Sequence, residues 1–531
     1  MKLFYILIFT CVIANSVYAN NLDMISSEED MAEYEKLMGI IDKYSDLVTK
    51  TRMNSDFVPG ILSVITRNEM DIAGFKTLID VLRSMTGINV YIDSVGVRTI
   101  SIRGIGGTVA SGNVKMMLNN IPVIDSLSSL TDILLDFPVS LMERIEIVRG
   151  PGSAIYGEYA YAGVVNIITR KENSMVSLGI ASLASISSSA LLNYDSQDQS
   201  THFSLMAHQF KTDGSDAVTG TDAYYFQVPD MKAISLAPGS TNEKQIGKSV
   251  FLSFKHNDTS FSGHMAQIYR GYYMGYYHYL YNLSEDTPHK LRQHAVQLSH
   301  KIRFNPQLNL TIKGGSQQYK FLFDHYYMYP PGYPFFPEGL LLPVDILERK
   351  HYANVDFSYH FDHHHVLFSL EYISSKSLFN SYALEMYRHI YSMVSQYECQ
   401  PFDNFLLTLG ARYDNYEDKY DNYDDIDHNI SPRIAGVYHF NSKHIFKFQY
   451  QEAFRPATTS ELTYIDTIKP PAINTYEFSY TYKSPLTRGR INLYHSILTQ
   501  VRQIKIESLV YQHFQFFFLT TNLTFCDFGI C

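Results

Sequence analysis

Four scarcities constrain the chain before any motif is considered. Among its 531 residues there is no tryptophan and there are 4 cysteines (Cys11, Cys399, Cys526 and Cys531) without a CxxC pair, which excludes a disulfide-built scaffold and a cysteine metal site. Only 18% of the residues are charged, and the net charge of −10 argues against a nucleic-acid partner. Beyond the first residues, polar or charged side chains interrupt every apolar run, so any membrane crossing must use strands.

The first residues have the composition of a secretion signal. Lys2 precedes an apolar run from Leu3 to Ile13, and Val17-Tyr18-Ala19 supplies residues that a signal peptidase accepts. An N-terminal membrane anchor is the alternative, but a helix needs about 20 apolar residues to cross a bilayer and this run is shorter. We therefore predict a signal peptide over residues 1–19 and export of the chain.

Residues 20–56 form a separate segment, acidic at first and then mixed. Apolar residues from Met31 to Val48 keep near-helical spacing, which predicts a short amphipathic helix. From Phe57 onward strand and helix signals alternate in short units, among them the helix FKTLIDVLRSM and the strands INVYID and ERIEIVRG. This pattern predicts a small α/β domain over residues 57–171.

A glycine-rich turn lies in the last part of that domain, in RGPGSAIYGEYAYAGVVNIITRK. Gly150, Gly152 and Gly157 permit tight backbone turns that larger residues would hinder. A phosphate-binding loop is the alternative, but no Gly-Lys-Ser or Gly-Lys-Thr follows and the next element is predicted to be a strand. We therefore interpret the stretch as a structural turn.

Residues 174–531 have a different pattern, in which segments of about ten residues alternate apolar and polar side chains. In the clearest segment Tyr476 and Phe478 lie on one face, whereas Glu477 and Ser479 lie on the other. A soluble sandwich also alternates, but short turns on one side and long aromatic loops on the other are typical of an outer-membrane barrel. We predict barrel strands in outer-membrane lipid.

The ordered motifs of residues 57–171 resemble the plug domain of TonB-dependent outer-membrane receptors. VPGILSVITRNEM, LIDVLRSMTGINV, SIRGIGG, VKMMLNNIPVID, MERIEIVRGPGSAIYG and AGVVNIITRK follow one another as in that family. Asn119-Asn120 replaces the family's usual Asp-Gly, and the turn is expected to survive because Asn tolerates positive φ. Farther along, LTLGARYDNY, ISPRIAGVYHF, FKFQYQEAFRPATTSEL and IKPPAINTYEFSYTYK resemble successive strands of the family's barrel.

The resemblance implies a transmembrane β-barrel with the plug inside it. The family closes its barrel with about 22 strands. Strand-like segments here number only about 15 or 16, and the chain ends in Cys531 where barrel assembly usually uses a terminal aromatic residue. An open barrel leaves strand edges unpaired in lipid. We therefore expect the barrel to be incomplete at its C-terminus, through truncation or a frameshift.

Three charged residues are candidates for contact between plug and barrel. Arg103 and Arg149 each precede a glycine on a plug strand, and the resemblance implies that they face carboxylates on the inner barrel wall. Glu477 is the matching candidate because its neighbours Tyr476 and Phe478 are predicted to point to lipid. A bidentate Arg–Glu pair would hold the plug and still yield to a pull.

The resemblance also implies a TonB box between the signal and the plug. The best match is Asp46-Leu47-Val48-Thr49-Lys50, an apolar pair between polar residues that can pair edge to edge with a strand of a partner. The end of the amphipathic helix is the alternative interpretation. The implied partner is the inner-membrane TonB–ExbB–ExbD complex.

Two aromatic stretches, at residues 269–282 and 321–339, are predicted to be extracellular loops. Their rings suit planar or catecholate ligands, although anchoring at the membrane surface explains many of them. His360 and His363 to His365 lie between two alternating segments, so we predict a tight turn there in preference to a metal or haem site. The ligand candidates are Tyr272, Tyr273, Tyr276, Tyr277, Tyr326, Tyr327, Phe335 and Phe336.

Two classes of function remain open at this point. The first is active import of a scarce chelate, for which the resemblance implies a ferric siderophore first, with cobalamin, haem or a carbohydrate behind it. The second is a surface binding protein without transport, or an inactive truncated receptor. No nucleophile–base pair or acidic dyad stands out, so we predict a protein that is not an enzyme and has no cofactor.

Overall fold

The computed structural model describes most of the two predicted domains. The signal peptide predicted over residues 1–19 lies outside the described part, and so do the TonB-box candidates Asp46 to Lys50. The described residues are 44–45, 53–54, 62–92, 96–105, 113–123, 132–171, 173–215, 217–221, 236–273, 280, 289–323, 327–329, 331–332, 335–341, 343–380, 384–420, 423–458, 471–484, 488–499 and 522–530.

Ahead of the α/β domain, the structure describes two short strands. β1 (Tyr44–Ser45) pairs antiparallel with β2 (Met53–Asn54). The predicted helix extended over Tyr44, so that end of the helix prediction is wrong. Helical spacing over so short a stretch does not separate a helix from other conformations in which the same apolar residues are buried.

The predicted α/β domain is confirmed as a plug built around a five-stranded sheet of order β3-β8-β9-β6-β7. β6 and β9 run parallel and the other neighbours antiparallel, while β4 and β5 form a separate hairpin. The elements are β3 (Leu62–Thr66), α3 (Arg67–Ile72), α4 (Leu78–Ser84), β4 (Ile88–Ile92), β5 (Arg98–Ile102), β6 (Val114–Leu118), β7 (Ile121–Pro122), the 3₁₀ helices η2 (Asp132–Leu134) and η3 (Val139–Leu141), β8 (Met142–Arg149), α5 (Ser153–Tyr156) and β9 (Gly163–Thr169).

Local sequence signals account for several of these boundaries. The Asp80 carboxylate accepts hydrogen bonds from the Thr77 backbone N–H at 2.9 Å and from its hydroxyl at 3.0 Å, which satisfies a free donor at the start of α4. Asn119 and Asn120 adopt φ of 49° and 66°, so the turn between β6 and β7 forms as predicted. The glycine-rich turn is followed first by the one-turn helix α5 and only then by the strand β9.

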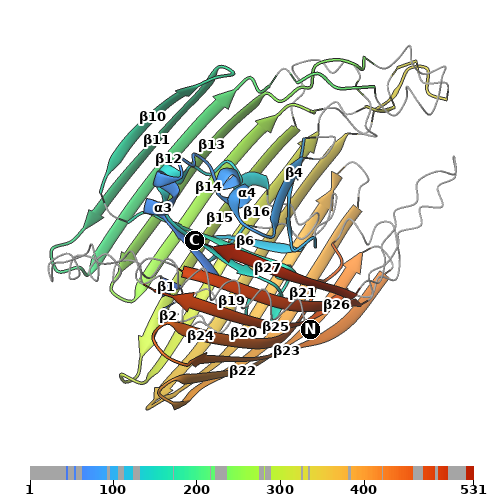
Figure 1. The fold of residues 1–531 in the computed structure, drawn as a ribbon. Helices are drawn as coiled ribbons and strands as arrows, with labels where there is room; N and C mark the ends of the chain where they lie inside the picture. The colour runs from blue at the N-terminus through green and yellow to red at the C-terminus, as the bar shows by residue number, and fades with distance from the viewer. Residues whose placement is uncertain are drawn as a thin grey trace, which may run out of the picture.

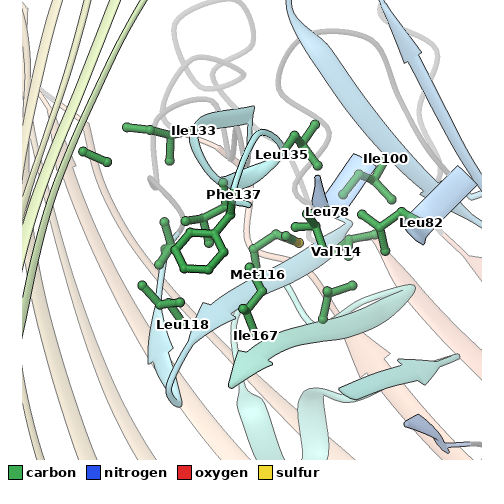
Figure 2. Packing of buried hydrophobic residues seen from close by; sticks show 14 of the residues in the cluster. Leu78, Leu82, Ile100, Val114, Met116, Leu118, Ile133, Leu135, Phe137 and Ile167 are labelled. Atoms are coloured by element: carbon green, nitrogen blue, oxygen red, sulfur yellow. The ribbon is translucent and has the colours of Figure 1, made fainter. Parts of the chain in front are cut away.

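The plug core lies between α4, η2 and the sheet. Figure 2 shows side chains from these elements converging on Met116, with Leu78 and Leu82 from α4 on one side and Phe137 and Leu118 on the other. Leu78, Leu82 and Met116 have no accessible surface. Burial of this apolar surface, at roughly 25 cal/mol per Å², is the main contribution that holds the plug elements together.

The second domain is one large antiparallel sheet that curves around the plug (Figure 1). Within the described residues sixteen strands pair in sequence order, and no pairing joins the first to the last. They are β10 (Met175–Ala181), β11 (Ser185–Asp195), β12 (Thr201–Thr212), β13 (Gln245–His256), β14 (Thr259–Arg270), β15 (His289–Arg303), β16 (Leu308–Phe323), β19 (Val344–Phe361), β20 (His364–Phe379), β21 (Leu384–Phe402), β22 (Phe405–Tyr420), β23 (Tyr423–His439), β24 (His444–Phe454), β25 (Ala472–Lys483), β26 (Arg488–Thr499) and β27 (Asn522–Ile530). A small separate hairpin joins β17 (Tyr327–Tyr329) and β18 (Leu340–Leu341).

Side chains alternate across this sheet as the sequence predicts. On β25 Tyr476 and Phe478 are 53% and 44% exposed on the outer face, whereas Glu477 between them is 6% exposed on the inner face. Short turns join strands at one rim, whereas at the other, which we call the loop rim, β12 ends 33 positions before β13 begins and β14 ends 19 positions before β15 begins. At the short-turn rim, Asp362 and His363 connect β19 to β20, so the predicted tight turn is confirmed. None of the described helices is long and apolar enough to cross a bilayer.

Candidate functional site at the plug–barrel interface

Arg103 and Glu477 are brought together in the interior although 374 positions separate them in sequence. The Arg103 guanidinium forms an ion pair with Glu477, whose second oxygen accepts a hydrogen bond from Gln449. The same guanidinium lies 3.9 Å from the ring centroid of Tyr494 on β26. Arg103, the residue directly after β5, therefore contacts two barrel strands, β25 and β26, through one side chain.

The backbone at Arg103 is constrained as well. Its φ is 55°, a left-handed value that a side chain adopts with strain, and its N–H donates to the Gly87 carbonyl at 2.7 Å. This turn directs the guanidinium away from the β4–β5 hairpin and toward the barrel wall. The functional role of the pair with Glu477 stays a prediction.

Arg149 lies in a different environment. Its guanidinium donates to the Thr86 carbonyl at 2.8 Å and to the Ser63 hydroxyl at 2.7 Å. Both acceptors belong to the plug, so these two bonds tie β8 to β3 and to the turn after α4. The predicted contact between Arg149 and the barrel wall stays a prediction.

A second group of charges at the interface was not identified from the sequence. Arg98 on β5 binds Asp132 at 2.9 Å and Asp136 at 2.6 Å, and Arg270 at the end of β14 forms ion pairs with the same two aspartates. Gln245 at the start of β13 donates to Asp136. We call these five residues the rim cluster, because Gln245 and Arg270 are barrel residues at the loop rim.

The rim cluster holds its charges by mutual compensation. Burial alone would raise the pKa of the Asp132 carboxyl, but Arg270 and Arg98 outweigh it and lower that pKa. Burial likewise would lower the pKa of the Arg98 guanidinium, yet Asp136 and Asp132 raise it. The rim cluster pairs two arginines with two aspartates, so its formal charges cancel.

The glycine-rich turn of the sequence makes the contact between the plug and the later barrel strands. Ser153 donates to the Phe454 carbonyl and Tyr161 to the Ala472 carbonyl, each at 3.2 Å. We call residues 150–163 the docking turn. Its shape depends on Gly157, which has φ of 66° and lies so close to the Arg412 guanidinium that a Cβ would approach to 2.6 Å.

Charged contacts reinforce the docking turn. Lys350 on β19 donates to Glu158 at 2.9 Å, and Arg388 on β21 donates to the Tyr159 hydroxyl at 3.2 Å. Burial alone would raise the pKa of Glu158, but Lys350 and then Lys115 lower it. Burial lowers the pKa of Lys115, whose ammonium donates to the Tyr156 carbonyl at 2.5 Å, to about 8.

The earlier barrel strands meet the plug mainly through apolar side chains, beside the rim cluster and a hydrogen bond from Gln317 to the Pro122 carbonyl at 2.8 Å. Phe137 of the plug and Phe251 of β13 pack edge to face with ring centroids 5.1 Å apart. The plug core continues without interruption into the inner face of β11–β16, through Leu191, Met206, Phe251, Ala266, Ile268, Leu291, Tyr319, Phe321 and Phe323. We call β11–β16 the apolar wall and β19–β26 the polar wall; Ile346, Ala453 and Ile473 are the polar-wall members of the same apolar cluster.

The aromatic ligand candidates occupy different environments. Tyr272 has no accessible surface and stacks on Phe323 with centroids 5.4 Å apart, which places it in the core and not on a ligand-facing surface. Tyr273 and Phe336 are half-buried, whereas Phe335 is 60% exposed. Tyr327 lies in β17. The candidates outside the described residues are Tyr276, Tyr277 and Tyr326.

The described residues contain no group of three or more His, Cys, Asp and Glu side chains placed to hold a metal ion. The interface is instead a set of ion pairs, hydrogen bonds and apolar contacts between two domains. Chemically, such an arrangement holds one body inside another and releases it when the ion pairs are hydrated or replaced.

Comparison with known families gives matches to both domains. The family model of the TonB-dependent receptor plug domain matches residues 55–164, and that of the TonB-dependent receptor-like β-barrel matches residues 185–501. Together these matches cover most of the chain.

Solved structures with a similar fold are outer-membrane receptors. The ferripyoverdine receptor of Pseudomonas aeruginosa aligns with a TM-score of 0.62 at 13% identity, covering 86% of this chain and 65% of that one. The alcaligin receptor of Bordetella pertussis gives 0.61 at 14% identity, with 86% and 73% covered. The ferric yersiniabactin uptake receptor of Yersinia pestis gives 0.58 at 16% identity, with 83% and 72% covered. This chain therefore spans just under two thirds of the length of the Pseudomonas receptor, and identities this low support the fold alone.

Proposed function

Because this chain belongs to the TonB-dependent receptors, we propose that it imports a scarce chelate across the outer membrane, with a ferric siderophore as the first candidate. The energy would come from the inner-membrane TonB–ExbB–ExbD complex acting on the N-terminal segment. The observation that carries the proposal is the plug inside the curved sheet, tied to it by the Arg103–Glu477 pair and the rim cluster.

The two faces of the sheet support this assignment. Large apolar side chains such as Leu205, Val250 and Phe478 are 38–44% exposed on the outer face, where lipid would cover them. The inner face carries Lys350, Arg388 and Glu477 against the plug. A wall that is apolar outside and charged inside suits a channel for a hydrophilic solute that a plug keeps shut.

The choice of cargo draws on the related structures. Three of these structures are named as receptors, of ferripyoverdine, of alcaligin and of ferric yersiniabactin respectively. Cobalamin, haem and a carbohydrate are the other cargoes to test. A surface binding protein without transport is the second functional class.

The test is uptake by cells that lack other receptors for the same chelates. Cells that produce the chain should accumulate ⁵⁵Fe from at least one of ferric pyoverdine, ferric alcaligin or ferric yersiniabactin, and a protonophore should abolish the uptake. Val48→Pro should stop uptake and leave binding intact, because proline cannot pair with a partner strand. Equal growth with and without the chain on every iron source would overturn the siderophore proposal, and binding without uptake would favour the second class.

A further inference from the structure

The plug is fastened to its two walls by contacts of different chemistry. Against the apolar wall, plug residues such as Phe137 and Ile133 share one continuous apolar cluster with Phe251 and Leu291. Against the polar wall, the docking turn forms hydrogen bonds and an ion pair at Ser153, Glu158, Tyr159 and Tyr161, beside a smaller apolar contact that includes Ala453 and Ile473. Water disfavours the separation of the apolar contacts, whereas it compensates in part for the loss of the polar ones.

Opening the apolar wall exposes apolar surface to water, and the free-energy cost grows with the area exposed. Opening the polar wall exchanges protein hydrogen bonds for bonds to water, so the net free-energy cost of each bond is small. The Glu158–Lys350 pair behaves similarly, since both ions regain hydration when they part. The rim cluster, in which Arg270 of β14 binds two aspartates of the plug, is a polar contact of the same kind, so it is the apolar cluster that makes the apolar wall costly to open.

We propose that the plug parts from the polar wall first and stays fastened to the apolar wall, so that a hydrophilic chelate crosses between the docking turn and β19–β25. The second half of this inference rests on the proposed function, whereas the order of opening does not. The surface uncovered in this way is lined by Lys350, Arg388, Arg412 and Glu477, which is chemically suited to a hydrated, charged solute.

The order of opening is tested by cysteine labelling of the purified receptor in detergent. Ser392→Cys and Thr475→Cys place thiols on the polar wall at positions 4% and 0% exposed, and Ala266→Cys and Ala295→Cys place matched thiols on β14 and β15 at 4% and 2%. All variants carry serine at the native cysteines. In urea below global unfolding, a water-soluble maleimide should label the polar-wall thiols about tenfold faster than the others.

Earlier or equal labelling at Ala266→Cys and Ala295→Cys would overturn the inference. Labelling of no thiol before global unfolding would overturn it as well, because the plug would then not part from one wall alone. These substitutions exchange one small side chain for another, so each variant is expected to fold. Folding of each variant is checked by its electrophoretic mobility under native conditions and by the protease resistance of its plug without ligand.

The path is tested by locking each wall in cells. Gly96→Cys with Tyr273→Cys closes the apolar side, because a Cβ at Gly96 would lie 3.3 Å from that of Tyr273, close to disulfide distance. Glu158→Cys with Lys350→Cys, joined by a bis-maleimide, closes the polar side. Uptake of the ⁵⁵Fe chelates named above should survive the first lock and cease with the second. The reverse result would overturn the path, and absence of uptake in both unlocked proteins would count against the proposed function while the labelling result still decides the order of opening.

Discussion

The apolar wall meets the plug with rings and aliphatic chains such as Phe251 and Leu291, whereas the polar wall meets it with Lys350, Arg388 and Glu477. Figure 1 shows the first wall in teal to yellow-green and the second in yellow through orange to red, with the blue plug helices between them. Both walls have the same strand geometry, so the difference lies in the inward-facing side chains alone. A barrel can thereby hold its plug permanently on one side and reversibly on the other.

The largest effect is expected from the apolar wall. Phe251→Ala removes the ring that packs on Phe137 and leaves a cavity, so the free energy of plug docking should fall by about 3–5 kcal/mol. The measurement is protease resistance of the plug as a function of urea. Phe254→Ala on the outer face of the same strand is the control, and its effect on docking should be below about 1 kcal/mol. Equal effects at both positions would show that the contact between Phe251 and Phe137 does not hold the plug.

At the polar wall, removal of one partner of a buried pair is expected to cost less. Glu477→Ala leaves Arg103 without its ion pair, which should lower the docking free energy by about 3 kcal/mol. Ser479→Ala, at the next inward position of β25, is the matched control. Unchanged protease resistance of the plug together with unchanged uptake would contradict a role for Glu477 in holding the plug.

Replacement of both partners of an ion pair sharpens the comparison. Glu158→Leu alone leaves Lys350 without its partner in the docking turn and should cost about 2 kcal/mol or more. The double replacement Glu158→Leu with Lys350→Met should lie within about 1 kcal/mol of the unmodified protein, because the desolvation of two ions disappears together with their attraction. A double-mutant cycle in urea measures the coupling. If the plug of the double variant docks less stably than the plug of the single variant, the ion pair contributes net stability.

The smallest effect is a pH dependence from Lys115. Its pKa in the folded plug is lowered by burial to about 8 from the usual 10.5, so between these values the unfolded plug holds a proton that the folded plug has released. Stability of the plug should therefore rise with pH through this window, and Lys115 should add no pH dependence below it, where both states hold the proton. Lys115→Met should remove the rise, as measured by urea unfolding at several pH values. A rise that persists in Lys115→Met would assign it to another group.

Much of the fold follows from local sequence. The alternation around Glu477 gives its inward direction, since neighbouring side chains of a strand point to opposite faces. The asparagine pair Asn119-Asn120 gives a turn because both residues tolerate positive φ, and both adopt it. In each case the relevant contacts involve residues a few positions apart.

The rim cluster could not be found in this way. Arg98 and Asp132 are 34 positions apart, and Arg270 lies 138 positions beyond Asp132, so nothing local links them. Tyr272 is a case in which local sequence gave a wrong expectation. Its aromatic neighbourhood predicts an exposed loop, whereas the ring is completely buried against His289 of β15 and Phe323 of β16. Whether a ring faces solvent or core depends on residues that are distant in sequence.

The most direct test of unequal fastening is hydrogen–deuterium exchange of the purified receptor, followed by peptide in detergent. The account predicts that amides of the docking turn, residues 150–163, exchange through local opening at lower denaturant than those of η2 and η3, residues 132–141, which face the apolar wall. Exchange of 132–141 before or together with the docking turn would contradict it.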